Sequence, residues 1–193
     1  HELDVARWAL GVHYPESVDV FSSKNHFIDD GWTMYDTMEA KFHFSNNLKI
    51  DWNCHSRNAH HSKKMGGRGT VIYGSKGSAS VNRNGYSIYD LDGKEIKNSV
   101  SNDNESGTEL GGGGNMTTKH FRNFFNSIRS GEVLNSPIND AVISQSMVHY
   151  ANLAHRSGKS FKIDSRNGNI LDSKIKKKFW SREYEKGWNL NFV

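Results

Sequence analysis

An alternation of apolar and polar residues between Asp36 and Phe44 limits the possible folds more than any other stretch. Residues two apart in a β-strand point to the same side, so this pattern predicts a strand with one buried and one solvent-facing side. A polar turn at 45–47 and a second alternation over 48–54 predict an antiparallel partner strand. The apolar positions are Met38, Ala40, Phe42, Phe44, Leu48, Ile50 and Trp52.

Short apolar segments separated by turn residues predict further strands. The pair Asp92-Gly93 is typical of a tight hairpin. Including the two strands above, five to seven strands up to residue 98 are expected in a mostly antiparallel sheet, and a short strand is expected later in the chain. The additional segments are 17–23, 70–73, 78–81, 86–89, 95–98 and 161–163.

Helical spacing of apolar residues marks the N-terminus and the second half of the chain. Residues 1–11 predict a helix, and Gly11 stands where a C-terminal cap belongs. Further helices are expected over 117–129, 137–156 and 173–188. The element order predicts an α+β fold, with a large, mostly antiparallel open β-sheet and helices packed on one face.

Length and low-complexity composition suggest the domain organisation. The 193 residues predict a single domain over 1–193. Residues 99–115 carry too little apolar area to become ordered, so a flexible surface loop is expected there. Its glycine run at 111–114 lacks the preceding strand that a phosphate-binding loop requires, which disfavours that interpretation.

Composition argues against several classes of function. The net charge of +4 comes with one dense basic run at 174–178, which is typical of a solvated helix face, so nucleic-acid binding is disfavoured. No apolar stretch reaches the length of a membrane span. A single cysteine, Cys54, excludes an intrachain disulfide and suits a reducing compartment, so a soluble protein is expected, cytoplasmic rather than periplasmic.

The loop expected over 57–69 is rich in His, Lys and Gly. Cys54, His55, His60 and His61 cluster in sequence, but their spacing fits no common zinc module, so a metal site is disfavoured. Long loops in compact domains are often functional. Three polar side chains of this loop are therefore candidate substrate contacts: Arg57, Asn58 and His60.

The first helix contains a candidate acid–base pair. His1 and Asp4 lie about one helical turn apart and can share a face. A histidine near a carboxylate can move protons near neutral pH, although most pairs at this spacing are surface pairs. The helix also lacks a start signal before its first residue, so we expect the chain to be a piece of a longer protein.

Residues 1–11 with Tyr14-Pro15 resemble the start of the C-terminal domain of the Gfo/Idh/MocA family of NAD(P)-dependent oxidoreductases. The resemblance is to bacterial members that act on sugar-like or cyclitol-like substrates, including NAD-dependent glycosidases. Further stretches that match, in order, are 36–44, 50–52 running to Arg57-Asn58, 69–77, 85–90, 153–158 and 180–184.

The resemblance implies a protein in which an N-terminal Rossmann domain binds NAD or NADP. The second, α+β domain shapes the substrate pocket and often forms the oligomer interface through its sheet. His1 matches the family histidine that assists proton transfer at a substrate hydroxyl, and Asp4 matches a carboxylate on the next turn. The motif aspartate four positions earlier, the Glu-Lys-Pro lysine and the dinucleotide-binding glycines are not in this chain.

These implications predict a substrate-binding and oligomerisation domain, inactive alone and binding no cofactor by itself. The expected catalytic residue is His1, with no metal ligand. The expected partners are a sugar or polyol substrate, the Rossmann domain, and further copies of the chain through the sheet. The expected substrate contacts are Asp4, Arg57, Asn58 and His60.

Two alternatives remain open at this stage. The chain can be a non-catalytic binding or assembly module, in which Phe42, Phe44 and Trp52 supply apolar surface for self-association. It can also be a domain of an NAD-dependent glycosidase of the same family.

Overall fold

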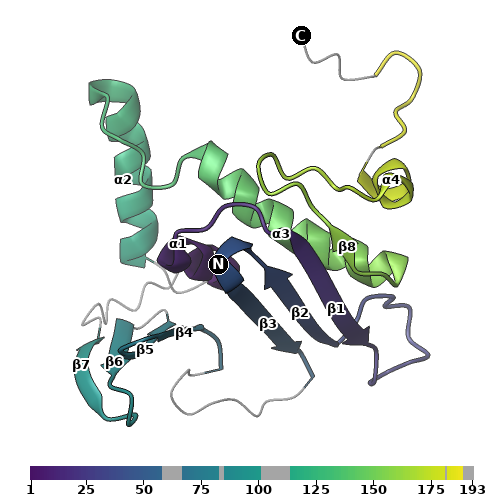
Figure 1. Cartoon of the computed structure of the whole chain (residues 1–193). Coiled ribbons are helices and arrows are strands. Elements are labelled where there is room, and N and C mark those ends of the chain that lie inside the picture. The colour runs from purple at the N-terminus through teal and green to yellow at the C-terminus, as the bar shows by residue number, and fades with distance from the viewer. Residues whose placement is uncertain (58–66, 83–84, 101–113, 181, 189–193) are drawn as a thin grey trace. The chain divides into compact units, whose positions relative to one another are not determined.

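The computed structural model describes residues 1–57, 67–82, 85–100, 114–180 and 182–188 (Figure 1). The chain forms two compact units, one of residues 1–9 and 59–142 and the other of residues 10–58 and 143–193. Each unit holds one four-stranded antiparallel sheet. The α+β class is therefore confirmed, but the expectation of one large sheet is wrong.

Sheet A has the strand order β3-β2-β1-β8. Its strands are β1 (Ser17–Ser23), β2 (Thr37–His43), β3 (Lys49–His55) and β8 (Phe161–Lys162). Val18 pairs with Phe42, and Phe42 pairs with Ile50, so the apolar positions of neighbouring strands share one face. Left-handed Asn46 and Asn47 make the turn between β2 and β3, as predicted.

Helix α3 (Ile138–Ser157) covers the apolar face of sheet A from Ile143 onward (Figure 1). Met147 and Tyr150 of α3 are fully buried, as are Val18 and Phe42 of the sheet. Two polar contacts fix the helix on the unit: Ser22 Oγ lies 2.7 Å from His155 Nδ1, and the Tyr35 hydroxyl donates to Asn152. Helix packing on one face is thus confirmed for this sheet.

The opposite face of sheet A is polar. His43 lies 2.8 Å from the Asp19 carboxylate, and Lys41 stands opposite Asp51. Phe42 and Phe44 were expected to supply apolar surface for self-association, but both are buried on the face of sheet A that α3 covers. Phe42 in β2 and Phe44 directly after this strand lie on the inner face, so neither side chain is available for an intermolecular contact.

Sheet B has the order β4-β5-β6-β7. Its strands are β4 (Thr70–Gly74), β5 (Gly77–Asn82), β6 (Gly85–Tyr89) and β7 (Glu95–Val100). The predicted hairpin at Asp92-Gly93 is confirmed, because the Asp90 carboxylate accepts the backbone N–H groups of Asp92 and Lys94 and closes the turn. In sheet B, tight turns connect consecutive strands and determine which strands pair. The long segment from β3 to β4 does not determine whether a strand of one sheet pairs with a strand of the other.

Helix α1 (Glu2–Leu10) ends at left-handed Gly11, and α2 spans Gly114–Ser130, so both predicted helices are confirmed. The helix expected over 173–188 is wrong. Among the described residues of that range, only α4 (Ser173–Ile175) and one π turn, η2 (Lys176–Trp180), form. Trp180 at the end of η2 stacks on the buried Tyr150 of α3, with ring centres 5.5 Å apart, in place of a continued helix. None of the helices among the described residues has the length and apolarity that a bilayer crossing requires.

Candidate functional site

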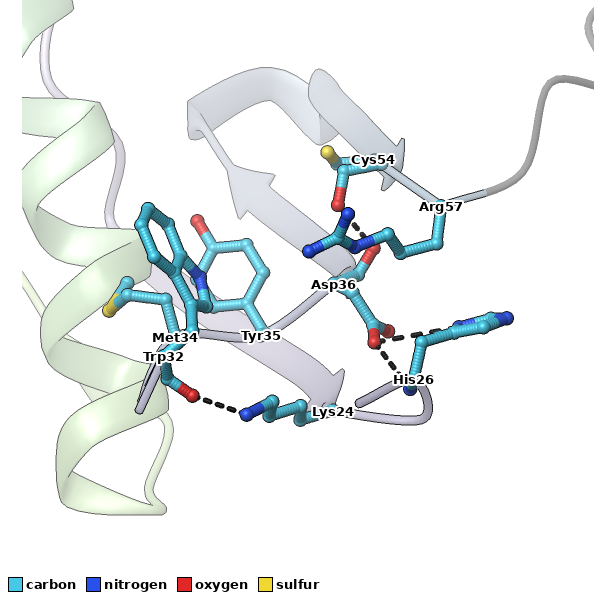
Figure 2. Close-up of a pocket in the computed structure, with 9 residues that line it drawn as sticks. Lys24, His26, Trp32, Met34, Tyr35, Asp36, Cys54 and Arg57 are labelled. Atoms are coloured by element: carbon cyan, nitrogen blue, oxygen red, sulfur yellow. Dashed lines mark hydrogen bonds and ion pairs between the residues drawn. The ribbon is translucent and has the colours of Figure 1, made fainter. Parts of the chain in front are cut away.

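A pocket of about 450 Å³ lies where β1, β2 and β3 meet the loop segments at one end of sheet A (Figure 2). The end of β1, the start of β2 and the end of β3 are brought together by antiparallel pairing, with Ser23 opposite Thr37 and Thr37 opposite His55. The lining residues are Lys24, His26, Trp32, Met34, Tyr35, Asp36, Cys54, Ser56 and Arg57.

Asp36 organises this pocket. Its carboxylate accepts the backbone N–H groups of Asn25 at 2.9 Å and His26 at 2.8 Å, and the Thr37 hydroxyl at 3.1 Å. Burial alone would raise the pKa of Asp36, but the hydrogen bonds from His26 and Asn25 outweigh it and hold the pKa below 3.8. The backbone carbonyl of Asp36 also accepts the N–H and hydroxyl groups of Ser56, so the carboxylate and carbonyl of this residue together join the ends of three strands.

Lys24 and Asp30 fold the intervening loop onto itself. The Lys24 ammonium donates to the Asp30 carboxylate and to the Trp32 carbonyl, as Figure 2 shows for the latter. The Asp30 carboxylate also accepts the Trp32 N–H at 2.9 Å. The hydrogen bond from Lys24 lowers the pKa of Asp30. This network places the exposed Trp32 indole at the rim of the pocket.

Arg57 is a predicted contact that the structure places in this pocket. Its guanidinium lies 5.1 Å from the centre of the Phe27 ring, a cation–π contact. Its positive charge also contributes to the low pKa of Asp30. Asn58 and His60, the other two residues predicted on this loop, lie outside the described residues.

The inner wall of the pocket is less polar. Tyr35 packs edge-on against His155 with ring centres 5.1 Å apart. Burial raises the pKa of the Tyr35 hydroxyl, and Cys54 adds to the effect. Burial also raises the pKa of the Cys54 thiol, so it stays protonated near neutral pH and is a poor nucleophile. Cys54 and His55 face opposite sides of β3, as expected.

His1 and Asp4 belong to the other compact unit. The His1 side chain is 94% exposed. Asp4 lies 3.6 Å from the guanidinium of buried Arg7, which also lies 3.8 Å from Asp140. Beside them, Arg68 donates to Glu2 at 2.7 Å. The acid–base role of His1 and the substrate contact of Asp4 therefore remain predictions.

Among the described residues we find neither a parallel dinucleotide-binding sheet nor a cluster of metal ligands. The strands of both sheets pair antiparallel, whereas a dinucleotide site is built on parallel βαβ units. Within the described ranges, no three His, Cys, Asp or Glu side chains converge as metal ligands. The pocket instead offers cations, hydrogen-bonding groups and aromatic surface, which suit a small polar ligand.

Most of the pocket was not predicted from the sequence. Residues 24–33 read only as polar and irregular, so Lys24, His26 and Trp32 carried no signal of their own. Asp36 was visible as the first residue of the alternating segment. Its place directly before a strand was the available hint, because a short acceptor side chain there can close the preceding loop.

No protein-family model matches the sequence, and no curated protein is significantly similar to it. Solved structures do match its fold. An oxidoreductase from Agrobacterium radiobacter, in complex with NAD+, L-tartaric acid and magnesium, matches with a TM-score of 0.62 at 12% identity, over 83% of this chain and 46% of that chain.

Two further matches cover similar shares of this chain and of the solved chains. The WlbA dehydrogenase from Bordetella pertussis, in complex with NADH and UDP-GlcNAcA, has a TM-score of 0.51 at 11% identity, over 85% of this chain and 43% of that one. The aldose-aldose oxidoreductase from Caulobacter crescentus, complexed with glycerol, has a TM-score of 0.51 at 12% identity, over 84% and 45%.

The chain thus spans about half the length of the solved proteins that it matches, and identities this low establish the fold alone. The resemblance noted in the sequence is confirmed at that level: the structure matches Gfo/Idh/MocA-type oxidoreductases over about half of each solved chain, consistent with their C-terminal domain.

Proposed function

We propose that residues 1–193 are the C-terminal, substrate-binding and oligomerisation domain of an NAD(P)-dependent oxidoreductase acting on a sugar-like or cyclitol-like substrate. The observation that carries this proposal is the fold match to an oxidoreductase holding NAD+ and L-tartaric acid, over 83% of this chain. Two other matching proteins hold polyhydroxylated molecules, UDP-GlcNAcA and glycerol, which supports a polyol class of substrate.

In this proposal the nicotinamide, held by the rest of the full-length protein, accepts or supplies the hydride. His1 exchanges a proton with the substrate hydroxyl, and Asp4 lies on the next turn of the same helix. Arg57 donates hydrogen bonds to substrate oxygens from the pocket at the end of sheet A. That pocket, about 450 Å³, falls within the usual size range of small-molecule sites. The chain alone is expected to be inactive.

The first experiment uses the full-length protein that contains this chain. NAD+ and NADP+ are titrated separately, and reduction is followed at about 340 nm with a panel of aldoses, inositols and tartrate. His1→Ala should lower kcat/KM by about 10²–10⁴-fold without weakening cofactor binding. His13→Ala, which removes another exposed histidine, is the matched control. Failure to bind either cofactor, or full activity of His1→Ala, would reject the assignment.

Substrate contact is tested by Arg57→Ala in the same protein. Loss of a guanidinium that donates to substrate oxygens should raise the substrate KM about tenfold or more and leave cofactor affinity unchanged. Arg166→Ala removes an exposed arginine of the same unit that does not line this pocket. Equal effects of the two substitutions would contradict the role of Arg57. Release of sugar without net cofactor reduction would instead indicate a glycosidase of this fold.

Assembly is proposed to use the open, polar face of sheet A. Phe21 lies opposite Glu39 on this face and is 65% exposed. Light scattering should show an oligomer that Phe21→Glu reduces to a smaller species, because a buried charge at the interface lacks a partner. Tyr73→Glu, at an exposed position of sheet B, should leave the oligomer intact.

A further inference from the structure

Helix α2 carries a row of apolar side chains that its own compact unit leaves exposed. They recur at helical spacing and therefore form one stripe along the helix. Their exposed fractions range from 45% to 68%. We call this row the α2 stripe, and it consists of Phe121, Phe124, Phe125 and Ile128.

The polar side of α2 contacts the segment that directly follows the helix. Asn123, nearly fully buried, donates to the Glu132 carboxylate at 2.7 Å and to the Val133 carbonyl at 2.9 Å. It also accepts the Asn135 N–H at 2.9 Å, and Asn126 donates to Glu132. A surface helix of a complete protein ordinarily turns its apolar stripe inward and its polar side outward. The arrangement of α2 is the reverse, which is the arrangement of a helix that packs against something beyond its own unit.

The size of the stripe indicates what kind of partner it fits. Aromatic side chains bury about 150–250 Å² each, so three half-exposed Phe and one Ile offer on the order of 400 Å². Interfaces between domains of one chain bury about 600–1,500 Å² counting both sides, so one side of about 400 Å² is sufficient. A stable dimer of separate chains needs about 800 Å² from each partner, which the stripe alone does not provide.

The matching oxidoreductases extend well beyond this fold, since the chain covers only 43% to 50% of their length. A covalently joined domain needs less interface than a free partner, because the connection keeps its local concentration high. α2 also carries Arg122 and Arg129 beside the stripe and no acidic residue, so the matching surface should be apolar with an acidic border.

We propose that the α2 stripe is the surface on which the cofactor-binding half of the full-length protein packs, an inference that rests on the function proposed above. Hydrogen exchange of the α2 amides tests it in three proteins: the full-length protein, its Phe121→Gln/Phe125→Gln variant, and its Lys119→Gln variant. Gln favours helix, so the substitutions remove apolar surface without breaking α2. Lys119 lies on the opposite side of the helix and serves as the matched control.

The expected result is slow exchange of α2 in the full-length protein, at least tenfold faster exchange in the double variant, and no change with Lys119→Gln. Unchanged exchange in the double variant overturns the proposal. A cofactor titration separates the two hypotheses. Protection of α2 without cofactor binding rejects the proposed function but supports packing of the two halves. Cofactor binding without protection of α2 supports the proposed function but rejects packing on the α2 stripe.

Experiments on the 193-residue chain exclude the other occupants of the stripe. A larger loss of thermal stability from the double substitution than from Lys119→Gln would show that the stripe packs within this chain. A dimer that the double substitution dissociates would identify a second copy as the occupant. Binding to phosphatidylserine vesicles that the double substitution abolishes would identify a membrane surface, a known use of basic amphipathic helices. Each of these three results overturns the proposal.

Discussion

Sheet A and sheet B each contain four antiparallel strands, but they are stabilised by different parts of the chain. Val18, Met38 and Phe42 in sheet A are completely buried beneath α3. Among the described strand residues of sheet B, only Ser80 falls in the buried class, and Tyr73 is 83% exposed. Side-chain packing therefore dominates sheet A, whereas backbone hydrogen bonds and tight turns dominate sheet B.

The difference follows from the sequence of the strands. β2 alternates strictly and offers a continuous apolar face to a helix. β5 offers Ser78 and Ser80 on one face and Ala79 and Val81 on the other, and Ser80 is its one buried residue. A sheet of this second kind depends on its hairpins for register. Sheet A should accordingly be sensitive to the loss of side-chain volume, and sheet B to changes at its turn glycines.

The largest effect is expected from Phe42→Ala in sheet A. Removing a fully buried ring leaves a cavity under α3 and should cost about 3–5 kcal/mol of unfolding free energy. The matched change in sheet B, Tyr73→Ala, should stay within about 0.5 kcal/mol because the ring is exposed. Urea titration followed by circular dichroism measures both, and similar losses would refute the proposed difference between the sheets.

Gly77→Ala should produce the next largest effect, and it should be confined to sheet B. A Cβ at position 77 would lie 2.1 Å from the Tyr89 carbonyl oxygen, and the φ angle of +147° disfavours any side chain. Overpacking together with backbone strain should cost about 2–4 kcal/mol. Amide exchange should accelerate in β4, β5 and β6 and stay unchanged in β1–β3. Gly93→Ala, with open space around the new Cβ, isolates the cost of positive φ alone.

Local structure in both sheets was predictable because it depends on neighbours in sequence. The alternation over 36–44 specified the buried face of β2, and Asp92-Gly93 specified a hairpin. The number of sheets was not predictable, because nothing in the residues between β3 and β4 encodes whether the two strands pair. The end of the chain was mispredicted for a related reason. Aromatic spacing favoured a long helix, but Trp180 instead stacks on Tyr150, 5.5 Å between ring centres, after a single π turn.

The candidate site was predictable only in part. Arg57 was identified because it lies in a loop of unusual composition next to a strand. The sequence did not predict Asp36, Lys24 and Trp32 as site residues, because their role arises from hydrogen bonds that form once the ends of β1, β2 and β3 are together. A sequence pattern reports periodicity within one element, and a pocket built from three strand ends has no periodicity.

Asp36→Asn tests how much of the stability of sheet A depends on an ionised carboxylate, and it should make one end of this sheet less sensitive to acid. The lowered pKa of Asp36 means that its ionised form stabilises the fold above pH 3.8, and that this stability is lost as the pH falls through the lower folded-state pKa. The variant should be less stable than the wild type at pH 7 and should lose less on acidification to about pH 2. Thermal melting across this range measures the difference, and parallel curves for the two proteins would contradict it. Asp51→Asn, on the open face, is the control.

The smallest effect is expected from His155, at the contact between α3 and β1. Burial lowers the pKa of His155, and nearby Arg156 adds to the shift, so the folded protein holds the ring neutral beside the Ser22 hydroxyl. A depressed histidine pKa gives stability that is present above pH 6.5 and is lost as the pH falls through the folded-state value. His155→Gln retains a hydrogen-bonding side chain without a titrating group, so its melting temperature should fall less between pH 7.5 and about pH 5 than that of the wild type. Amide exchange resolves where this loss occurs, and it should appear in β1 and α3 while sheet B keeps its protection. The same acid response in His155→Gln and in a His13→Gln control would show that another group causes it.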